Sequence, residues 1–104
     1  MTASKQTWQS ESKPNKIVVN DQIYVKTIVH RFFVDLDIDT GIYVGTDIYD
    51  WEQSEMGKWV IENSLDKPTL VTHEDITTYR MNCAIVAFLL DRDHTFFQLK
   101  WNTQ

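Results

Sequence analysis

The sequence predicts an α+β fold in which a mostly antiparallel sheet of five or six strands packs against one helix at about residues 50–64. Three observations lead to this prediction. Residues 83–90 contain no polar side chain, which is typical of a strand buried on both faces. A second apolar run, at 95–101, follows after only four polar residues, as in a β-hairpin. Residues 50–64 instead place apolar side chains at helical spacing.

Length, charge and cysteine content limit the domain organisation. A chain of 104 residues is expected to form one domain. We assign this domain to residues 16–104, after a flexible polar arm at 1–15 that contains the aromatic Trp8. The net charge is −5, although residues 1–16 carry +2, and an acidic body does not attract phosphate backbones. Cys83 is the single cysteine, which excludes an intrachain disulfide and favours a reducing compartment.

The first half of the domain is predicted to consist of strands. Asn20 and Asp21 tolerate positive φ and indicate a tight hairpin turn between strands at 17–19 and 23–25. The second strand continues to residue 38, which is long, so we expect a bulge near His30 and Arg31 where the alternation slips. Residues 39–41 form a turn in this interpretation, and 42–49 form a further strand broken at Gly45.

The predicted helix at 50–64 begins at Asp50, which can cap it, and ends before Pro68. Gly57 falls on its polar side, where it costs about 1 kcal/mol relative to alanine. The apolar stripe that would cover the 83–90 strand consists of Met56, Trp59 and Val60. Residues 69–72 are then a short strand and 73–75 a loop. A small bent β-barrel of the Sm or OB type, with the helix as an insertion, is the alternative architecture.

Three aspartates are the candidate metal ligands. Asp35, Asp37 and Asp39 alternate with apolar residues and would share one strand face, about 7 Å apart. We interpret them as a solvated face that resists edge aggregation, with a weak divalent-cation site as the alternative. The EF-hand spacing is incomplete because Thr40 stands at the required glycine. Residues 39–41 read Asp-Thr-Gly and resemble the active-site motif of dimeric aspartic proteases, but no glycine follows Gly57 to form that family's flap tip.

The other chemically reactive residues are dispersed. His30, His73 and His94 form neither an H-x-x-x-H pair nor an H-E-x-x-H motif, so we expect them at turns or on the surface. Cys83 lies inside an apolar run, where burial raises the pKa of a thiol and makes it inert. The sequence therefore predicts a protein that is not an enzyme, with no catalytic residues and no cofactor.

Two segments resemble known proteins. Residues 51–63, Trp-Glu-Gln-Ser-Glu-Met-Gly-Lys-Trp-Val-Ile-Glu-Asn, and residues 95–101, Thr-Phe-Phe-Gln-Leu-Lys-Trp, are similar to small uncharacterised proteins encoded by tailed phages of marine cyanobacteria. The resemblance implies no particular activity. It implies a phage or marine metagenomic origin, an assembly or accessory role, and the cytoplasm of the host cell as the location. No apolar run reaches the roughly 18 residues that would span a membrane.

The predicted function is that of a self-associating structural or accessory protein. One helix cannot cover both faces of the sheet, and a large exposed apolar patch favours association with a second copy. Aromatic side chains are enriched in such interfaces. The candidates are Trp8, Tyr24, Phe32, Tyr43 and Phe96. The alternative function is a nucleic-acid-binding module of a small β-barrel type, which the acidic body disfavours.

Overall fold

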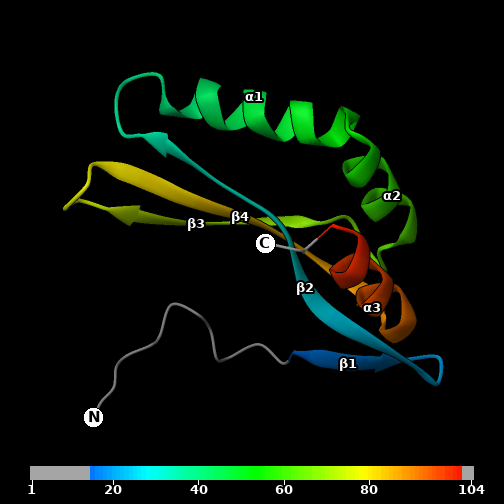
Figure 1. Cartoon of the computed structure of the whole chain (residues 1–104). Helices are drawn as coiled ribbons and strands as arrows, with labels where there is room; N and C mark the ends of the chain where they lie inside the picture. The colour runs from blue at the N-terminus through cyan, green and yellow to red at the C-terminus, as the bar shows by residue number, and fades with distance from the viewer. Residues whose placement is uncertain (1–14, 102–104) are drawn as a thin grey trace, which may run out of the picture.

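A computed structural model describes residues 15–101, which form an antiparallel sheet with three helices (Figure 1). The arm predicted at 1–15, with Trp8, lies outside the described residues except for Asn15. In chain order the elements are β1 (Lys16–Val19), β2 (Gln22–Asp35), α1 (Thr40–Gln53), α2 (Glu55–Asn63), β3 (Thr69–Asp75), β4 (Arg80–Leu90) and α3 (Asp91–Lys100). The α+β class and the antiparallel sheet are confirmed.

The β1–β2 hairpin has the tight turn that its sequence predicts. Val19 pairs with Gln22, so only two residues form the loop. Those residues, Asn20 and Asp21, have φ angles of 51° and 65°. Two consecutive positive φ values define the type I′ turn, whose twist matches that of the flanking strands. The turn therefore follows from local residue preference and is confirmed.

The bulge predicted in the long strand is also confirmed. The register between β2 and β4 shifts between Ile28 and His30, which leaves Val29 as the extra residue on β2. A bulge bends a strand and increases its twist. The sheet, in the order β1-β2-β4-β3, consequently curls into a half-barrel (Figure 1). Within residues 15–101 it has four strands, not five or six, and it is a half-barrel, not the closed Sm or OB barrel considered as the alternative.

All three helices pack on the same face of this sheet. Each contributes one buried side chain to the main core: Trp51 from α1, Val60 from α2 and Phe97 from α3. The strands contribute Val29, Ile85, Ala87 and Leu89 to the same cluster. A smaller cluster joins Val44 of α1 to the far end of β2 and β4. One face of the sheet is therefore covered, and the other faces away from every described helix.

Residues 42–49 are helical, not the strand that their β-branched and aromatic content favours. They belong to α1, where Val44, Ile48 and Trp51 follow helical spacing and face the sheet. Burial of this stripe against β2 and β4 decides between two conformations that the local sequence permits. The long predicted strand accordingly ends at Asp35 and not at residue 38.

The single helix predicted at 50–64 is wrong in its boundaries. Residues 50–53 are the end of α1, and α2 begins after Ser54, which has extended dihedral angles. The hydroxyl of Ser54 accepts a hydrogen bond from the backbone N–H of Gly57 at 3.0 Å, so Ser54 caps the helix in place of Asp50. The break allows α2 to turn and pack on β4 (Figure 1).

The predicted hairpin partner at 95–101 is wrong, because β4 leads directly into α3. Phe97 and Trp101 are four residues apart, which fits one helix face as well as one strand face. Asp91 and Asp93 lie in the first turn and Lys100 in the last, where each charge favours the helix dipole. β3 also continues through 73–75, which the sequence analysis placed in a loop.

Gly57 is the tightest point between α1 and α2. A Cβ atom at this position would lie 1.8 Å from the carbonyl oxygen of Trp51, which is backbone and cannot rotate away. The glycine is buried, not on the polar side where the sequence analysis placed it. The angle between the two helices therefore requires that residue 57 lack a side chain.

We predict that Gly57→Ala lowers the free energy of unfolding by about 2 kcal/mol or more, as overpacking usually does. Gly45→Ala is the matched control, because a Cβ there meets nothing within 4 Å. In a helix interior this change should raise stability by up to about 1 kcal/mol. Urea unfolding measures both variants. Equal effects of the two substitutions would contradict the close helix approach at Gly57.

Candidate functional site

The three aspartates do not form the strand face that was predicted for them. Asp35 ends β2, whereas Asp37 and Asp39 lie in the loop before α1. The Asp37 carboxylate accepts a hydrogen bond from the backbone N–H of Asp39 at 2.8 Å, and the Thr40 hydroxyl donates to the Asp37 carbonyl at 2.7 Å. These hydrogen bonds fix the backbone conformation of the loop that precedes α1. Within residues 15–101, no three acidic, histidine or cysteine side chains are placed to hold a metal ion.

The sheet face without helices is the first candidate surface, here called the helix-free face. The strand register places apolar side chains of three strands on it: Tyr24, Ile28, Phe33, Val71, Phe88 and Leu90. Phe33 is 53% exposed. Lys26, Arg31 and Arg80 lie on the same face, and the Arg80 guanidinium lies 4.2 Å from the centre of the Phe33 ring. Asp35 and Asp75 both pair with Arg80 and therefore lie on this face too, at the end away from Lys26. The middle of this face is therefore apolar with basic side chains beside it.

The outward side of α1 is the second candidate surface, here called the outer α1 surface. Ile42 and Tyr49 are seven residues apart on one helix face, opposite Val44 and Trp51, and are 65% and 61% exposed. Gly45 lies between them and leaves the backbone open. The helix is acidic, since α1 contains Asp47, Asp50 and Glu52 and no Lys or Arg.

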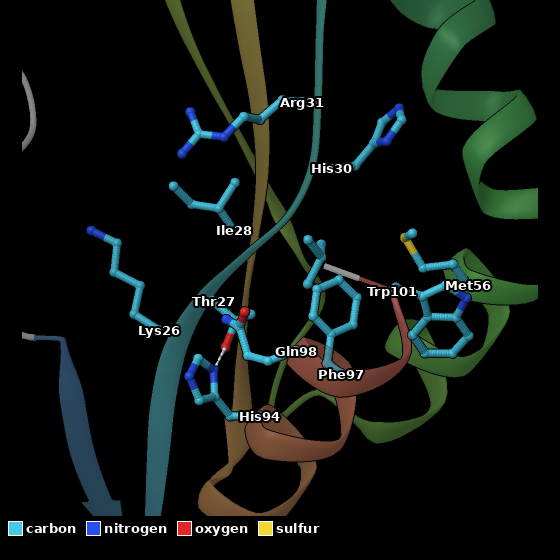
Figure 2. A pocket seen from close by; sticks show the side chains of 11 residues that line it. Lys26, Thr27, Ile28, His30, Arg31, Met56, His94, Phe97, Gln98 and Trp101 are labelled. Carbon is cyan, nitrogen blue, oxygen red and sulfur yellow. Dashed lines mark hydrogen bonds between the residues drawn. The ribbon is translucent and has the colours of Figure 1, made fainter. Parts of the chain in front are cut away.

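A groove of about 570 Å³ runs along the free edge of β2 (Figure 2). β1 pairs with β2 only as far as Val25, so the edge beyond it has no neighbouring strand among the described residues. Lys26, Ile28 and Arg31 line one side of the groove. The other side is lined from the helix-covered face, by Thr27, His30, Met56, His94, Phe97 and Trp101 among others. Side chains from both faces of β2 are therefore accessible in the groove.

Thr27 and His94 form a buried polar contact in this groove. Thr27 is 1% exposed, and its hydroxyl donates to the carbonyl of Val25 at 3.0 Å. The hydroxyl oxygen lies 2.9 Å from Nδ1 of His94 (Figure 2). Because the hydroxyl proton is already donated, Nδ1 of His94 must be the donor to this oxygen. The contact satisfies a buried hydroxyl and holds α3 against β2.

Within the described part of the chain, burial shifts the pKa values of His30 and Cys83. His30 stacks on Trp51 at a ring separation of 6.0 Å, and burial lowers its pKa, with Asp47 opposing the effect. Burial raises the pKa of the Cys83 thiol, and the negative charge of Asp47 adds to this. The raised thiol pKa predicted from the sequence is confirmed. A protonated buried thiol is a poor nucleophile.

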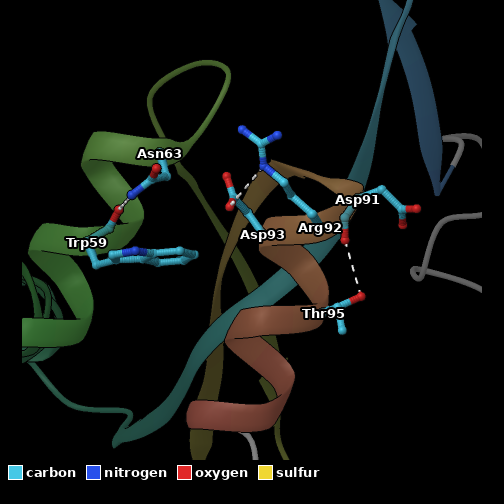
Figure 3. A network of polar contacts seen from close by, with 6 residues as sticks. All are labelled: Trp59, Asn63, Asp91, Arg92, Asp93 and Thr95. Carbon is cyan, nitrogen blue, oxygen red and sulfur yellow. Dashed lines mark hydrogen bonds and ion pairs between the residues drawn. The ribbon is translucent and has the colours of Figure 1, made fainter.

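The five aromatic residues proposed as an interface do not share one surface. Tyr24 lies on the helix-free face, Phe32 packs half-buried against the core, and Tyr43 is on α1. Phe96 belongs to α3, where its ring centre lies 5.3 Å from that of Trp59 on α2. Trp59 extends from α2 towards α3 (Figure 3). Trp8 lies outside the described residues.

The sequence analysis missed Phe33 and Ile42. Phe33 was hidden by the bulge, because one extra residue reverses the faces of all later side chains in β2. Ile42 was assigned to a strand, whereas its spacing of seven residues from Tyr49 is a helical signal.

Comparison of the chain with models of protein families, with curated proteins and with solved structures finds no match. Within the described residues, no helix is both long and apolar enough to cross a membrane.

We predict that stability falls as the pH drops from about 7.5 to about 5.5, in part through His30. The folded pKa of His30 lies below the ordinary value of 6.5, so the unfolded chain binds this proton more tightly. The part of the free energy of unfolding that depends on neutral His30 is therefore fully present above pH 6.5 and is lost as the pH falls below this value. Urea unfolding at both pH values should show a smaller loss for His30→Gln. An unchanged loss would show that burial of His30 does not contribute.

Proposed function

We propose that this chain is a non-enzymatic structural or accessory protein that assembles with copies of itself. The observation that supports this most directly is the presence of two exposed apolar surfaces on opposite sides of the sheet, the helix-free face and the outer α1 surface. Soluble monomers rarely leave large apolar patches uncovered. An assembling protein of this size also fits the resemblance to proteins of tailed phages.

The two surfaces point in opposite directions. α1 packs on the covered face of the sheet through Val44 and Trp51, so Ile42 and Tyr49 face away from the sheet. Phe33 lies on the other side of the sheet, where no described helix packs (Figure 1). One copy can therefore use each surface at the same time, without the two contacts excluding each other.

Charge favours contact between unlike surfaces. Asp50 and Glu52 flank the outer α1 surface, whereas Lys26 and Arg31 lie beside Ile28 on the helix-free face. Pairing of two outer α1 surfaces would bring like charges together, whereas contact of this surface with the Lys26 and Arg31 end of the helix-free face would pair opposite charges. Complementary charge steers association and suppresses wrong pairings. We infer a head-to-tail arrangement, which produces a ring if its rotation closes and a filament if it does not.

We predict that Phe33→Glu and Ile42→Glu each leave the chain monomeric, because every contact needs both surfaces and each substitution blocks one of them in all copies. An equimolar mixture of the variants should form a dimer of two 12.3 kDa chains, since each supplies the surface that the other lacks. Sedimentation velocity measures the sizes. Both substitutions fall at exposed positions, so the fold should be retained.

The control is Tyr79→Glu, at an exposed position in the loop between β3 and β4 that belongs to neither surface. This variant should assemble like the unchanged chain. A wild-type chain that remains a folded monomer at high micromolar concentration would contradict self-assembly. If the unchanged chain assembles but the mixture of the two blocked variants forms no dimer, only the head-to-tail arrangement is contradicted, and self-assembly is not.

A nucleic-acid-binding function is the second candidate, and the helix-free face favours it. Exposed Phe33 lies there among Lys26, Arg31 and Arg80, a combination that stacks bases and contacts phosphates on the sheets of RNA-binding domains. The acidic remainder of the chain opposes this function.

If the face binds single-stranded nucleic acid, Phe33→Ala should weaken binding by about 1–3 kcal/mol. Binding should also weaken as salt is raised, with a smaller salt dependence for Arg31→Gln. Fluorescence anisotropy with a single-stranded RNA oligonucleotide measures both effects. The absence of binding at low salt would exclude this candidate.

A further inference from the structure

A cavity of about 860 Å³ lies on the covered face of the sheet, between the junction of α1 and α2 and the first residues of β3. It shares no lining residue with the groove beside β2. Trp51 and Ile85 are the most buried of its lining residues, at 6% and 4% exposure. Apolar side chains of α2, of the connection to β3 and of β3 itself form the walls: Ile61, Leu65, Pro68 and Leu70. A cavity of this volume with apolar walls is typical of small-molecule sites.

The cavity exists because the helices cover β4 but leave the neighbouring strand β3 open. Leu70 of β3 pairs with Ile85 of β4, so both side chains lie on the covered face. Trp51 of α1 and Val60 of α2 pack in the same core cluster as Ile85. Leu70 is nevertheless 40% exposed, because no described helix reaches over it. The uncovered side chain of Leu70 and the buried side chain of Trp51 therefore face a common space.

The wall formed by residues 64–68 is fixed to the sheet, so the cavity is formed before any ligand enters. These residues lead from α2 into β3 (Figure 1). The backbone N–H of Leu65 donates to the carbonyl of Phe88 at 2.9 Å, and Ser64 forms an isolated bridge with Leu89. The hydroxyl of Ser64 donates to the carbonyl of Asp66 at 2.6 Å. The ring of Pro68 restricts the last turn of the wall.

The charged residues of the lining favour a positively charged ligand. Glu52 of α1 and Asp66 of the connection supply two negative charges, and Lys67 supplies one positive charge. Within residues 15–101, none of these three side chains forms an ion pair or a hydrogen bond. The whole chain has a net charge of −5, so its field also attracts cations. An anionic ligand would meet two carboxylates with only one ammonium group to balance them.

We propose that this cavity binds an apolar small molecule that carries a single positive charge. Its ring or chain packs against Trp51, Leu70 and Ile85, and its ammonium group lies near Glu52 and Asp66 at the rim. The inference does not depend on the proposed function, because neither Phe33 nor Ile42 lines the cavity.

The test is a fluorescence titration with aminoanthracene, an apolar probe that is uncharged at neutral pH. Two competitors of similar size then displace it, the cation naphthylmethylamine and the anion of naphthoic acid. The amine should displace the probe at a concentration about fivefold lower than the acid does. Glu52→Gln and Asp66→Asn should each weaken the amine about twofold to fivefold, as expected for partly exposed ion pairs. The measurement uses the full chain with Ile42→Glu, which blocks the outer α1 surface, so that assembly cannot cover the rim.

Two substitutions that fill the cavity identify the place of binding. Leu70→Trp and Ile61→Trp lie on different walls and should each lower the affinity for aminoanthracene about tenfold or more. Leu99→Trp is the matched control, at an exposed position of α3 that does not line the cavity, and it should keep the affinity. Leu70 and Ile61 are 40% and 45% exposed, so the fold should tolerate both changes, which urea unfolding verifies.

Three results would overturn the proposal. The first is the absence of saturable binding of aminoanthracene. The second is binding that neither Leu70→Trp nor Ile61→Trp weakens, since the probe would then occupy another surface, such as the helix-free face. The third is displacement by the acid at the same or a lower concentration than by the amine, which would show that the cavity does not select a cation.

Discussion

The structure depends on the packing of three helices against one face of a four-stranded sheet. Trp51, Val60 and Phe97 come from different helices and meet over Ile85 and Leu89. This arrangement requires a sharp change of direction between α1 and α2, which Ser54 provides by its extended conformation and its hydrogen bond to Gly57. The absence of a side chain at Gly57 lets the carbonyl of Trp51 approach.

Placing every helix on one face has consequences for the rest of the surface. The opposite face of the sheet keeps apolar side chains that no described helix covers, and α1 is apolar on its outward side as well as its inward side. α1 contains Asp47, Asp50 and Glu52 and no Lys or Arg, while Lys26 and Arg31 are basic neighbours of Ile28. The separation of charge between two apolar surfaces is the physical basis for the proposed head-to-tail assembly.

The groove beside β2 has a different origin. β1 is four residues long and β2 is fourteen, so most of the β2 edge lacks a partner within residues 15–101. The type I′ turn sets the register of the hairpin, and the same register extends to the bond between Lys26 and Asn15.

Local sequence by itself determined the features that depend on neighbouring residues. Asn20 and Asp21 specify the hairpin turn, the slipped alternation near His30 specifies the bulge, and the apolar run at 83–90 specifies the buried strand β4. The antiparallel sheet and the raised pKa of Cys83 were predictable for the same reason.

Only the tertiary structure decided the conformation of residues 42–49 and 95–101. Both segments have apolar side chains that fit a strand and a helix equally well, and burial of Val44 and Phe97 against the sheet selects the helix. The exposure of Phe33 and Ile42 could not be predicted for related reasons. The exposure of Phe33 depends on the bulge, which reverses the faces of the later β2 side chains, and that of Ile42 depends on residues 42–49 being helical. Periodicity over short segments is ambiguous, and the free energy of long-range packing resolves it.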